Sequence, residues 1–353
     1  MGYRDVDAVV KEDGFEEDLP LLWFVESETV YDKERILQSI QMLLAEEGFD
    51  TRSRILDVSG GIGFPYIELR KLGFNVDYND ASPHMLAWTE REIQKAGVAP
   101  GRHFNLRWQD FPFQEEYDVL ICMGNSLPYA AGSWGGQKVK DVWTKRNETS
   151  DAIKESMARF SVALKPGGII YVDWAVPDST AFENKRPFKS EGKDLLLMKR
   201  VLNNICDDNM RQWELWVAEP GEHYDRVLVK YRSVVPYLEG AHVAWYLNNA
   251  GFSDIQDVWL LGQENGRVVS PQREIHRGYL SGVRIVGDFS KVETFKRVDV
   301  DSEDSRPVGD VPLTSPENRD YSMRHPTYPG LIARKPQRSN CNINTLSEPL
   351  QNI

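Results

Sequence analysis

The segment ILDVSGGIGF, residues 55–64, places three glycines within four positions directly after a run of apolar residues. The apolar run has the composition of a buried strand, and Pro65 follows where a helix would begin. A glycine-rich turn between a strand and a helix lets the backbone approach a ligand closely and directs helix N-terminal amides toward it. A structural turn, a nucleotide site and a dinucleotide site share this feature, so the glycines alone do not choose among them.

Strands and helices alternate around this turn. Helices are predicted at residues 34–47, 65–72, 83–95, 149–164 and 241–250. Strands are predicted at residues 54–58, 75–79, 104–109, 117–123, 168–174, 255–261 and 283–286. This alternation predicts an α/β fold with a doubly wound, seven-stranded, mainly parallel sheet that helices cover on both faces.

The pattern changes after Trp174. Strand-like runs at 195–202, 211–218 and 226–235 are separated by polar turns, which predicts an antiparallel β meander inserted at about residues 180–235. Beyond about residue 298 the chain has little periodicity. We therefore expect one domain over residues 1–297, followed by an extended or disordered tail over 298–353.

Composition limits the classes of partner. The chain has 353 residues, 41% of them hydrophobic, and a net charge of −12, which disfavours nucleic acid or an anionic membrane as the main partner. A small-molecule partner is expected instead. No apolar run approaches the length of about 18 residues that a membrane span needs, and the N-terminus is acidic, so a cytoplasmic protein is expected. The three cysteines are widely separated, and no metal site is predicted.

Two acidic residues accompany the glycine loop. Asp57, just before the glycines, favours a ligand that carries an ammonium group and disfavours a phosphate. Asp80 ends the second predicted strand, where a carboxylate can accept hydrogen bonds from both ribose hydroxyls of a nucleoside. The alternative for Asp80 is a helix N-cap, because Ala81-Ser82-Pro83 follows it. The glycine spacing also departs from the GxGxxG type that a dinucleotide enzyme needs.

Five segments taken together resemble the successive motifs of class I S-adenosylmethionine (SAM)-dependent methyltransferases. They are ILDVSGGIG, NVDYNDASPHML, WQDFPF, YDVLICMGNS and ALKPGGIIYVDW. The run ICMGNSLPY and the antiparallel insertion resemble, more narrowly, the glycine N-methyltransferase and glycine/sarcosine methyltransferase group. The resemblance implies methyl transfer from SAM to a small-molecule acceptor, with S-adenosylhomocysteine (SAH) as product. An amine nitrogen of an amino acid or related metabolite is the leading acceptor, while sulfur or oxygen methylation and a catalytically silent SAM-binding regulatory subunit remain open.

The same resemblance implies a cofactor site. The Ser59–Gly63 loop would lie along the methionine part of SAM, Asp80 would bind the ribose, and the Asp110-Phe111 pair would border the adenine. Trp23 is a further aromatic candidate for covering the methionine side. The implied cofactor-binding residues are Tyr31, Arg35, Ser59, Gly60, Gly61, Gly63, Asp80, Ala81, Met85, Asp110, Phe111 and Met123.

The acceptor is expected beside the fourth strand. Methyl transfer depends on positioning rather than on a strong acid or base, so no catalytic acid or base is predicted and Asn125 is expected to position the acceptor. Gly124-Asn125-Ser126 leaves this strand at the carboxyl edge of the sheet, where substrates bind in such folds. Aromatic residues nearby would either cage a cation or pack a lid. The expected acceptor-binding residues are Asn125, Ser126, Tyr129, Trp134, Trp174 and His242.

Two departures from the glycine-methylating group affect the acceptor. Where that group has Asp-His-Arg-Asn, this chain has Asp173-Trp174-Ala175-Val176, so the arginine that would hold a substrate carboxylate is missing. Val234 stands where a tyrosine is expected. Simple glycine is therefore disfavoured, unless another arginine reaches the pocket; the candidates are Arg186, Arg200, Arg211 and Arg232. The N-terminal segment and the meander are candidate contact surfaces for a homo-oligomer.

Overall fold

The structure is a computed structural model of the 353-residue chain. It describes residues 5–6, 15–30, 33–132, 141–143, 146–174, 182–190, 192–205, 210–221, 225–238, 240–260, 283–286 and 328–337. Tyr31, Trp134 and Ala175, named above as candidates or departures, lie outside the described residues.

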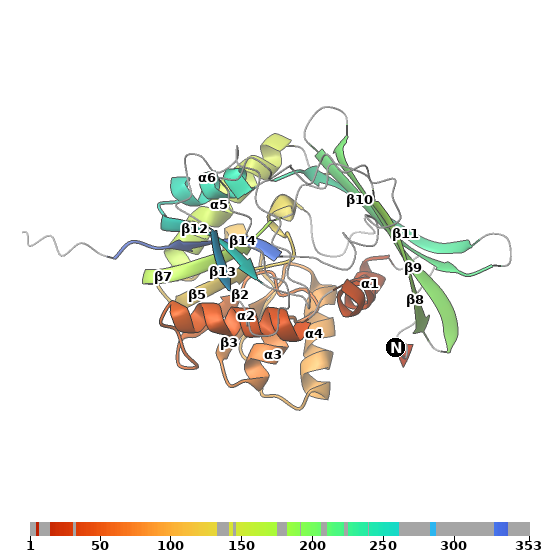
Figure 1. The fold of residues 1–353 in the computed structure, drawn as a ribbon, viewed down its shortest axis with the longest axis horizontal. Helices are drawn as coiled ribbons and strands as arrows, with labels where there is room; N and C mark the ends of the chain where they lie inside the picture. The colour runs from red at the N-terminus through yellow and green to blue at the C-terminus, as the bar shows by residue number, and fades with distance from the viewer. Residues whose placement is uncertain are drawn as a thin grey trace, which may run out of the picture.

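An eight-stranded sheet forms the centre of the larger part of the molecule, with the order β13-β12-β14-β7-β5-β2-β3-β4 (Figure 1). Its strands are β2 (Arg54–Asp57), β3 (Asn75–Asn79), β4 (His103–Phe104), β5 (Tyr117–Cys122), β7 (Leu164–Asp173), β12 (Ser253–Leu260), β13 (Val283–Val286) and β14 (Tyr328–Arg334). Strand β14 pairs antiparallel with β7 and β12, and all other pairs are parallel. The predicted doubly wound, mainly parallel sheet is confirmed, with one strand more than expected.

Helices cover both faces of this sheet. Helices α5 (Arg146–Ala163) and α6 (Gly240–Asn249) lie over one face, and α2 (Lys33–Glu46), α3 (Tyr66–Lys71) and α4 (Pro83–Lys95) lie over the other (Figure 1). Successive strand residues point to opposite faces. Accordingly, the fully buried Ile55 packs into the core beside α2 and α3, whereas its neighbour Leu56 packs into the core beside α5 and α6. Burial on both faces explains why this strand has an unbroken apolar run.

Two parts of the predicted outline are wrong. Residues 328–334 were expected in the tail, but they form β14, whose Leu331 and Ala333 are fully buried between β7 and β12. The third strand was expected over 104–109, but β4 ends at Phe104 and residues Trp108–Asp110 form the 3₁₀ turn η1. The chain thus leaves the sheet early at this position.

A second, six-stranded sheet has the order β1-β8-β9-β10-β11-β6. Its strands are β1 (Asp5–Val6), β6 (Asp141–Trp143), β8 (Phe182–Ser190), β9 (Lys193–Ile205), β10 (Met210–Glu219) and β11 (Arg226–Pro236). Strands β8 to β11 form an antiparallel meander at the predicted place, and β1 and β6 extend it in parallel at the two edges. Helix α1 (Phe15–Val30) lies between the two sheets (Figure 1). Its Leu19, Leu22 and Val25 share a core with residues of α4 and of the second sheet.

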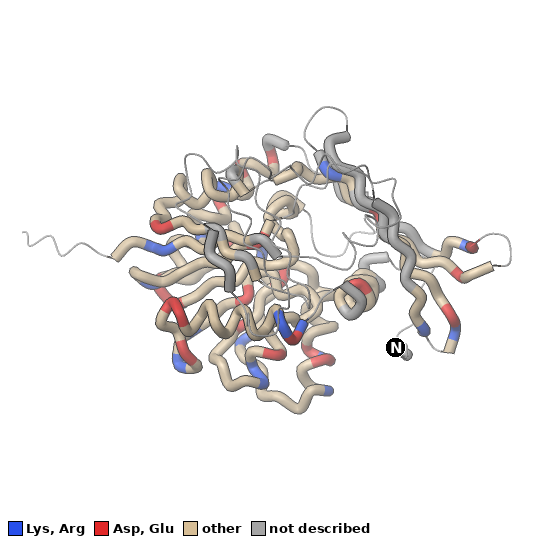
Figure 2. Tube along the Cα trace, in the orientation of Figure 1, with Lys and Arg blue, Asp and Glu red and all other residues tan. Residues whose placement is uncertain are grey.

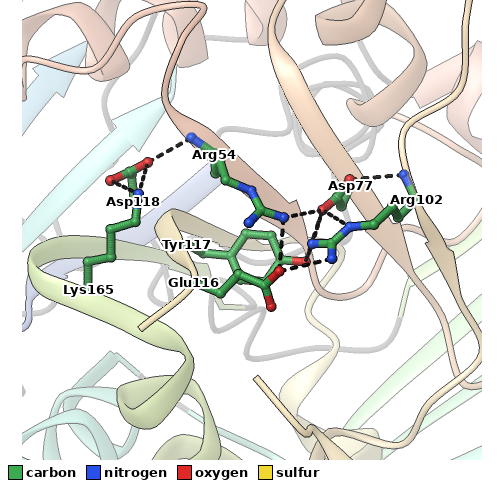
Figure 3. A network of polar contacts seen from close by, with 7 residues as sticks. All are labelled: Arg54, Asp77, Arg102, Glu116, Tyr117, Asp118 and Lys165. Atoms are coloured by element: carbon green, nitrogen blue, oxygen red, sulfur yellow. Dashed lines mark hydrogen bonds and ion pairs between the residues drawn. The ribbon is translucent and has the colours of Figure 1, made fainter. Parts of the chain in front are cut away.

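A network of charged residues lies near the amino ends of β2 and β5 (Figure 3). Arg102 donates to Asp77 at 2.6 Å, and Tyr117 Oη donates to the same carboxylate at 3.0 Å. Burial alone would raise the pKa of Asp77, but these hydrogen bonds hold it below its ordinary value. The remaining members of the network are Arg54, Glu116, Asp118 and Lys165. These contacts join neighbouring strands, so we assign the network a structural role.

The charge distribution agrees with the acidic composition. Acidic and basic residues are interspersed along the described chain rather than gathered in one basic tract (Figure 2). In the part of the chain that the structure describes, no helix combines the length and apolar character needed to cross a membrane.

Candidate functional site

A cavity of about 210 Å³ lies at the carboxyl ends of β2, β3 and β5. Strand β2 pairs with β3 on one side and with β5 on the other, so the order of the chain reverses here. Ligands of open α/β sheets bind at such a switch point. The lining residues that follow the three strands are Val58, Ser59, Gly60, Gly61, Ile62, Phe64, Asp80, Ala81, Ser82, Met85, Met123, Gly124 and Ser126.

The glycine loop is fixed tightly to the neighbouring strand. The Gly60 amide donates to the carbonyl of Asn79 at 2.9 Å, and the Gly61 carbonyl accepts hydrogen bonds from Tyr78 Oη and Thr89 Oγ1 at 2.7 and 2.9 Å. A Cβ atom at position 60 would lie only 2.1 Å from the Tyr78 ring. At position 63, the φ angle of +94° lies in the left-handed region that favours glycine. Both positions therefore require glycine to keep this loop shape.

Asp57 carries a buried carboxylate next to the loop. Its side chain is 1% exposed, and Oδ1 accepts a long hydrogen bond from the Ser59 amide at 3.4 Å. Oδ2 is buried and has no hydrogen-bond partner among the described residues. Burial raises the pKa of Asp57 well above its ordinary value, and the nearby Asp80 charge adds to the rise. An unsatisfied buried carboxylate is costly, and a cationic donor would relieve that cost.

Asp80 connects the end of β3 to the glycine loop. Its Oδ2 accepts from the Gly61 amide at 2.9 Å, and its Oδ1 accepts from the Ser82 amide at 2.8 Å. Burial raises the pKa of Asp80 to about 6, against the opposing effect of these two hydrogen bonds. The N-cap of α4 is Ser82, whose Oγ accepts from the Met85 amide at 3.4 Å, so the helix-cap alternative for Asp80 is not realised. Each carboxylate oxygen retains acceptor capacity for a ligand hydroxyl in the cavity.

The residues after β4 line one side of the cavity. Trp108 donates from Nε1 to the Val58 carbonyl at 2.7 Å, and Gln109 donates from Nε2 to the Ala130 carbonyl at 2.9 Å. Both side chains line the cavity. The predicted pair behaves differently, because Asp110 is exposed and Phe111 is buried in the core against Phe160. The early end of β4 produces this change.

A second buried carboxylate holds the loop after β5. Asp173, at the end of β7, accepts hydrogen bonds from the amides of Gly124 and Asn125, both at 2.7 Å. These two residues have positive φ angles of 81° and 52°. Burial raises the pKa of Asp173 to about 7. The loop is further fixed by Ser126, whose Oγ donates to the Met123 carbonyl at 2.6 Å.

Helix α1 and the second sheet form the far side of the cavity. Leu19, Trp23 and Ser27 of α1 and Tyr231 of β11 line it. Tyr129, in the 3₁₀ turn η2 (Leu127–Tyr129), also lines it and accepts a 3.3 Å hydrogen bond from Ser233 Oγ of β11. The second sheet therefore contributes directly to the site.

The predicted site residues divide into three groups. Those that line the cavity are Ser59, Gly60, Gly61, Asp80, Ala81, Met85, Met123, Ser126 and Tyr129. Those described but not lining it are Arg35, Gly63, Asp110, Phe111, Asn125, Trp174 and His242. Residues Tyr31 and Trp134 are not described. Trp174 is 4% exposed and packs in the core of the main sheet, so it does not reach the cavity.

Sequence reasoning missed several lining residues, among them Leu19, Ser27, Trp108 and Tyr231. Trp108 is the first residue of the WQDFPF motif. The motif was recognised, but the role of bordering the adenine was given to Asp110 and Phe111, which follow Trp108 by two and three residues. Among the described residues, no group of three or more His, Cys, Asp or Glu side chains is arranged to hold a metal ion.

Comparisons with known proteins bear on the resemblance. No family model matches the chain. The chain is 27% identical over 150 residues to the glycine/sarcosine/dimethylglycine N-methyltransferase of Actinopolyspora halophila, covering 40% of this chain and 23% of that protein. It is 26% identical over 213 residues to the glycine/sarcosine N-methyltransferase of Aphanothece halophytica, covering 57% of this chain and 67% of that protein. These matches confirm the resemblance that the motifs indicated, and they span from about a quarter to two thirds of the relatives' lengths.

Among solved structures, the chain is similar to the SAM-bound amino pentose methyltransferase CalS10 of Micromonospora echinaspora. The TM-score is 0.49 and the sequence identity 16%, with 69% of this chain and 91% of that chain covered.

Proposed function

We propose that this protein transfers a methyl group from SAM to a nitrogen atom of a small-molecule amine. The observation that carries the proposal is that the buried carboxylate of Asp57 and the partly buried carboxylate of Asp80 lie beside a close-packed glycine loop at one cavity. Asp57 offers an unsatisfied oxygen to a cation, and Asp80 offers acceptors to hydroxyl groups. Sequence similarity to glycine and sarcosine N-methyltransferases supports the proposal independently.

The residues of the cavity fit SAM by their chemistry. The carboxylate of Asp57 would attract the ammonium group, and Gly60 and Gly61 leave room for the methionine chain because they carry no side chains. Asp80 would accept the ribose hydroxyls, and Trp108 with Gln109 would border the purine. When bound, SAM supplies an electrophilic methyl group on a sulfonium centre.

The chain contributes position and shelter rather than acid or base chemistry. The loop Met123–Ser126 is held rigid by Asp173 and Ser59, so it presents a fixed edge to an acceptor. Leu19 and Trp23 of α1 line the cavity on the side of the second sheet and give it an apolar wall there. Holding two reactants at short range in the correct orientation can supply most of the acceleration that such a displacement needs.

The main experiment incubates the purified chain with SAM and a panel of small amines, amino acids, thiols and hydroxy acids, and measures SAH release. We expect turnover with amines. Turnover confined to thiols or alcohols would replace nitrogen with sulfur or oxygen as the methylated atom. Tight SAM binding without turnover on any member of the panel would favour the regulatory alternative.

A matched binding experiment tests the assignment of Asp57. Asp57→Asn keeps the size of the side chain but removes its charge. We expect SAH affinity to fall about 10- to 100-fold, as for the loss of a charged hydrogen bond. Affinity for 5′-methylthioadenosine, which lacks the ammonium group, should be unchanged. Equal losses for both ligands would contradict the ammonium-binding role.

A further inference from the structure

The side chain of Ser59 holds the backbone of Met123 at two points. Ser59 Oγ accepts a hydrogen bond from the Met123 amide and donates one to the Met123 carbonyl, both at 3.0 Å. Ser59 belongs to the glycine loop that follows β2, and Met123 begins the loop that follows β5. One hydroxyl group therefore joins two loops at positions that are 64 residues apart in the sequence.

This contact begins where the backbone pairing of β2 with β5 ends. The two strands are in parallel register as far as Asp57 and Ile121. One further backbone hydrogen bond runs from the Val58 amide to the Ile121 carbonyl at 2.9 Å. At the next position the Ser59 hydroxyl, rather than a backbone group, bonds to Met123. The side chain thus continues the contact between the two strands by one residue into the loops.

The loop after β5 is held from two sides. The Met123 carbonyl also accepts a hydrogen bond from Ser126 Oγ at 2.6 Å, so two hydroxyl donors occupy both lone pairs of this oxygen. The two backbone amides that follow Met123 in the chain donate to Asp173 of β7, both at 2.7 Å. Asp173 therefore ties this loop to β7, and Ser59 ties it to the glycine loop.

The two loops face different reactants in the proposed function. Ser59, Met123 and Gly124 all line the cavity. The glycine loop would carry the methionine part of SAM, and the loop after β5 would face the acceptor. Methyl transfer needs the methyl carbon and the attacking atom at short range and in line, and a misplacement of about 1 Å can cost about 100-fold in rate. The contact that fixes one loop against the other therefore bears on the rate.

We propose that Ser59 is a positioning residue that sets the distance between the methyl group of SAM and the acceptor atom, by fixing Met123. This inference rests on the proposed function and goes beyond it, since it assigns the alignment of the two reactants to one side chain. The hydroxyl proton of Ser59 is already donated to the Met123 carbonyl, so it is not available to a ligand. Loss of the hydroxyl should therefore slow methyl transfer without weakening cofactor binding.

The test compares turnover with binding in Ser59→Ala, using the acceptor that gives the fastest SAH release with the wild-type chain. This change removes both hydrogen bonds to Met123 and leaves the backbone of the glycine loop in place. We expect kcat to fall about 10- to 100-fold, with the same fall in single-turnover experiments that start from the preformed complex. SAH affinity and the KM for the acceptor should stay within about threefold of the wild-type values. Ser59→Thr keeps the hydroxyl and should restore at least part of kcat.

Ser53→Ala is the matched control, because it removes the same group from a residue just before β2, whose Oγ accepts from the Asp50 amide at 3.1 Å. It should leave kcat and SAH affinity unchanged. The thermal unfolding midpoint shows whether Ser59→Ala is folded. If it is not, Ser59→Cys takes its place, since a thiol is similar in size but forms weaker hydrogen bonds. An unchanged kcat in the folded variant would overturn the positioning role, and so would equal losses of kcat and SAH affinity.

Amide hydrogen exchange tests the link between the two loops without any methyl acceptor. With both chains saturated with SAH, we expect the Met123 amide to exchange at least about tenfold faster in Ser59→Ala than in the wild-type chain, because it has lost its hydrogen-bond acceptor. Ser53→Ala should exchange at the wild-type rate.

The two measurements separate the role of Ser59 from the proposed function. If the wild-type chain methylates no acceptor, the proposed function fails, while faster exchange in Ser59→Ala still supports the link and equal exchange overturns it. If the wild-type chain methylates an amine and Ser59→Ala does so equally fast, the positioning role is overturned and the proposed function stands.

Discussion

The carboxylate of Asp80 accepts a hydrogen bond from the Gly61 amide at 2.9 Å, so the end of β3 is tied to the loop that follows β2. The same carboxylate accepts from the Ser82 amide at the start of α4. One partly buried side chain thus fixes the relative positions of two loops that line the cavity. It can do so and still face a ligand, because a carboxylate has about four acceptor sites.

Asp80→Ala should therefore weaken nucleoside binding more than it weakens the fold. We expect SAH affinity to fall about 100-fold, from the loss of two charged hydrogen bonds, and unfolding free energy to fall by about 1–3 kcal/mol. Calorimetry and chemical denaturation measure the two effects. Asp50→Ala is the control, because Asp50 is exposed and contacts only its neighbours Arg52 and Ser53 among the contacts described. Unchanged SAH affinity in Asp80→Ala would remove Asp80 from the site.

Gly60→Ala should disrupt the loop by a direct clash. The new Cβ atom would lie 2.1 Å from the Tyr78 ring, and that ring is held by its hydrogen bond to the Gly61 carbonyl. We expect a loss of about 1–3 kcal/mol in unfolding free energy from overpacking, together with weaker SAH binding. Gly73→Ala is the comparison, since Gly73 is exposed with φ +84° and open space around it. It should cost only about 1–2 kcal/mol of backbone strain and leave SAH binding unchanged. Equal binding losses in both variants would contradict the steric role of Gly60.

The sequence predicted the part of the fold in which local pattern and burial agree. Strands β2, β3, β5 and β7 are apolar runs bounded by turn residues, and each was located to within a few residues. Strand β14 was missed because only Leu331, Ile332 and Ala333 are apolar in a row, and the strand forms through pairing with residues far away in sequence. Helix α1 was missed because Pro20 interrupts a nearly continuous apolar run, which has no clear helical period.

The predicted residues that line the cavity lie mainly in loops that directly follow a strand. The glycine loop and Asp80 follow strands whose ends are evident, so nine of the predicted residues line the cavity. Phe111 was expected at the cavity because the third strand was predicted to continue to residue 109. The strand ends earlier, and the turn η1 places Trp108 at the cavity instead. Tyr231 and the lining residues of α1 depend on how the second sheet packs against the first, and no local pattern encodes that arrangement.

Asp173 should make stability depend on pH. Burial raises the pKa of its folded-state carboxyl to about 7, from 3.8, so the folded chain holds a proton that the unfolded chain releases. The stabilisation that this proton gives the folded chain is fully present below about pH 4 and is lost as the pH rises toward 7. Over that range the free energy of unfolding should fall by at most about 1.4 kcal/mol per pH unit. Asp173→Asn cannot titrate, so its stability relative to the wild-type chain should improve as the pH rises from 4.5 to 7.5. Denaturation at several pH values measures this difference, and Asp50→Asn is the exposed control. A difference that stays constant with pH would show that Asp173 titrates normally.

Trp108 and Asp110 provide the final contrast, because they are two residues apart in the same turn but only one lines the cavity. The ring of Trp108 is fixed by the 2.7 Å hydrogen bond from Nε1 to Val58 and by an edge contact with Phe160. We expect Trp108→Leu to weaken SAH binding about 10- to 100-fold, since stacking of a base on an aromatic ring is worth about 1–3 kcal/mol. Asp110→Ala should leave binding unchanged because its side chain is exposed. Quenching of tryptophan fluorescence on SAH binding should also decrease in Trp108→Leu. If Asp110→Ala lost SAH affinity and Trp108→Leu retained it, Asp110 would border the adenine, as the motif predicted. The assignment of Trp108 to that position would then be wrong.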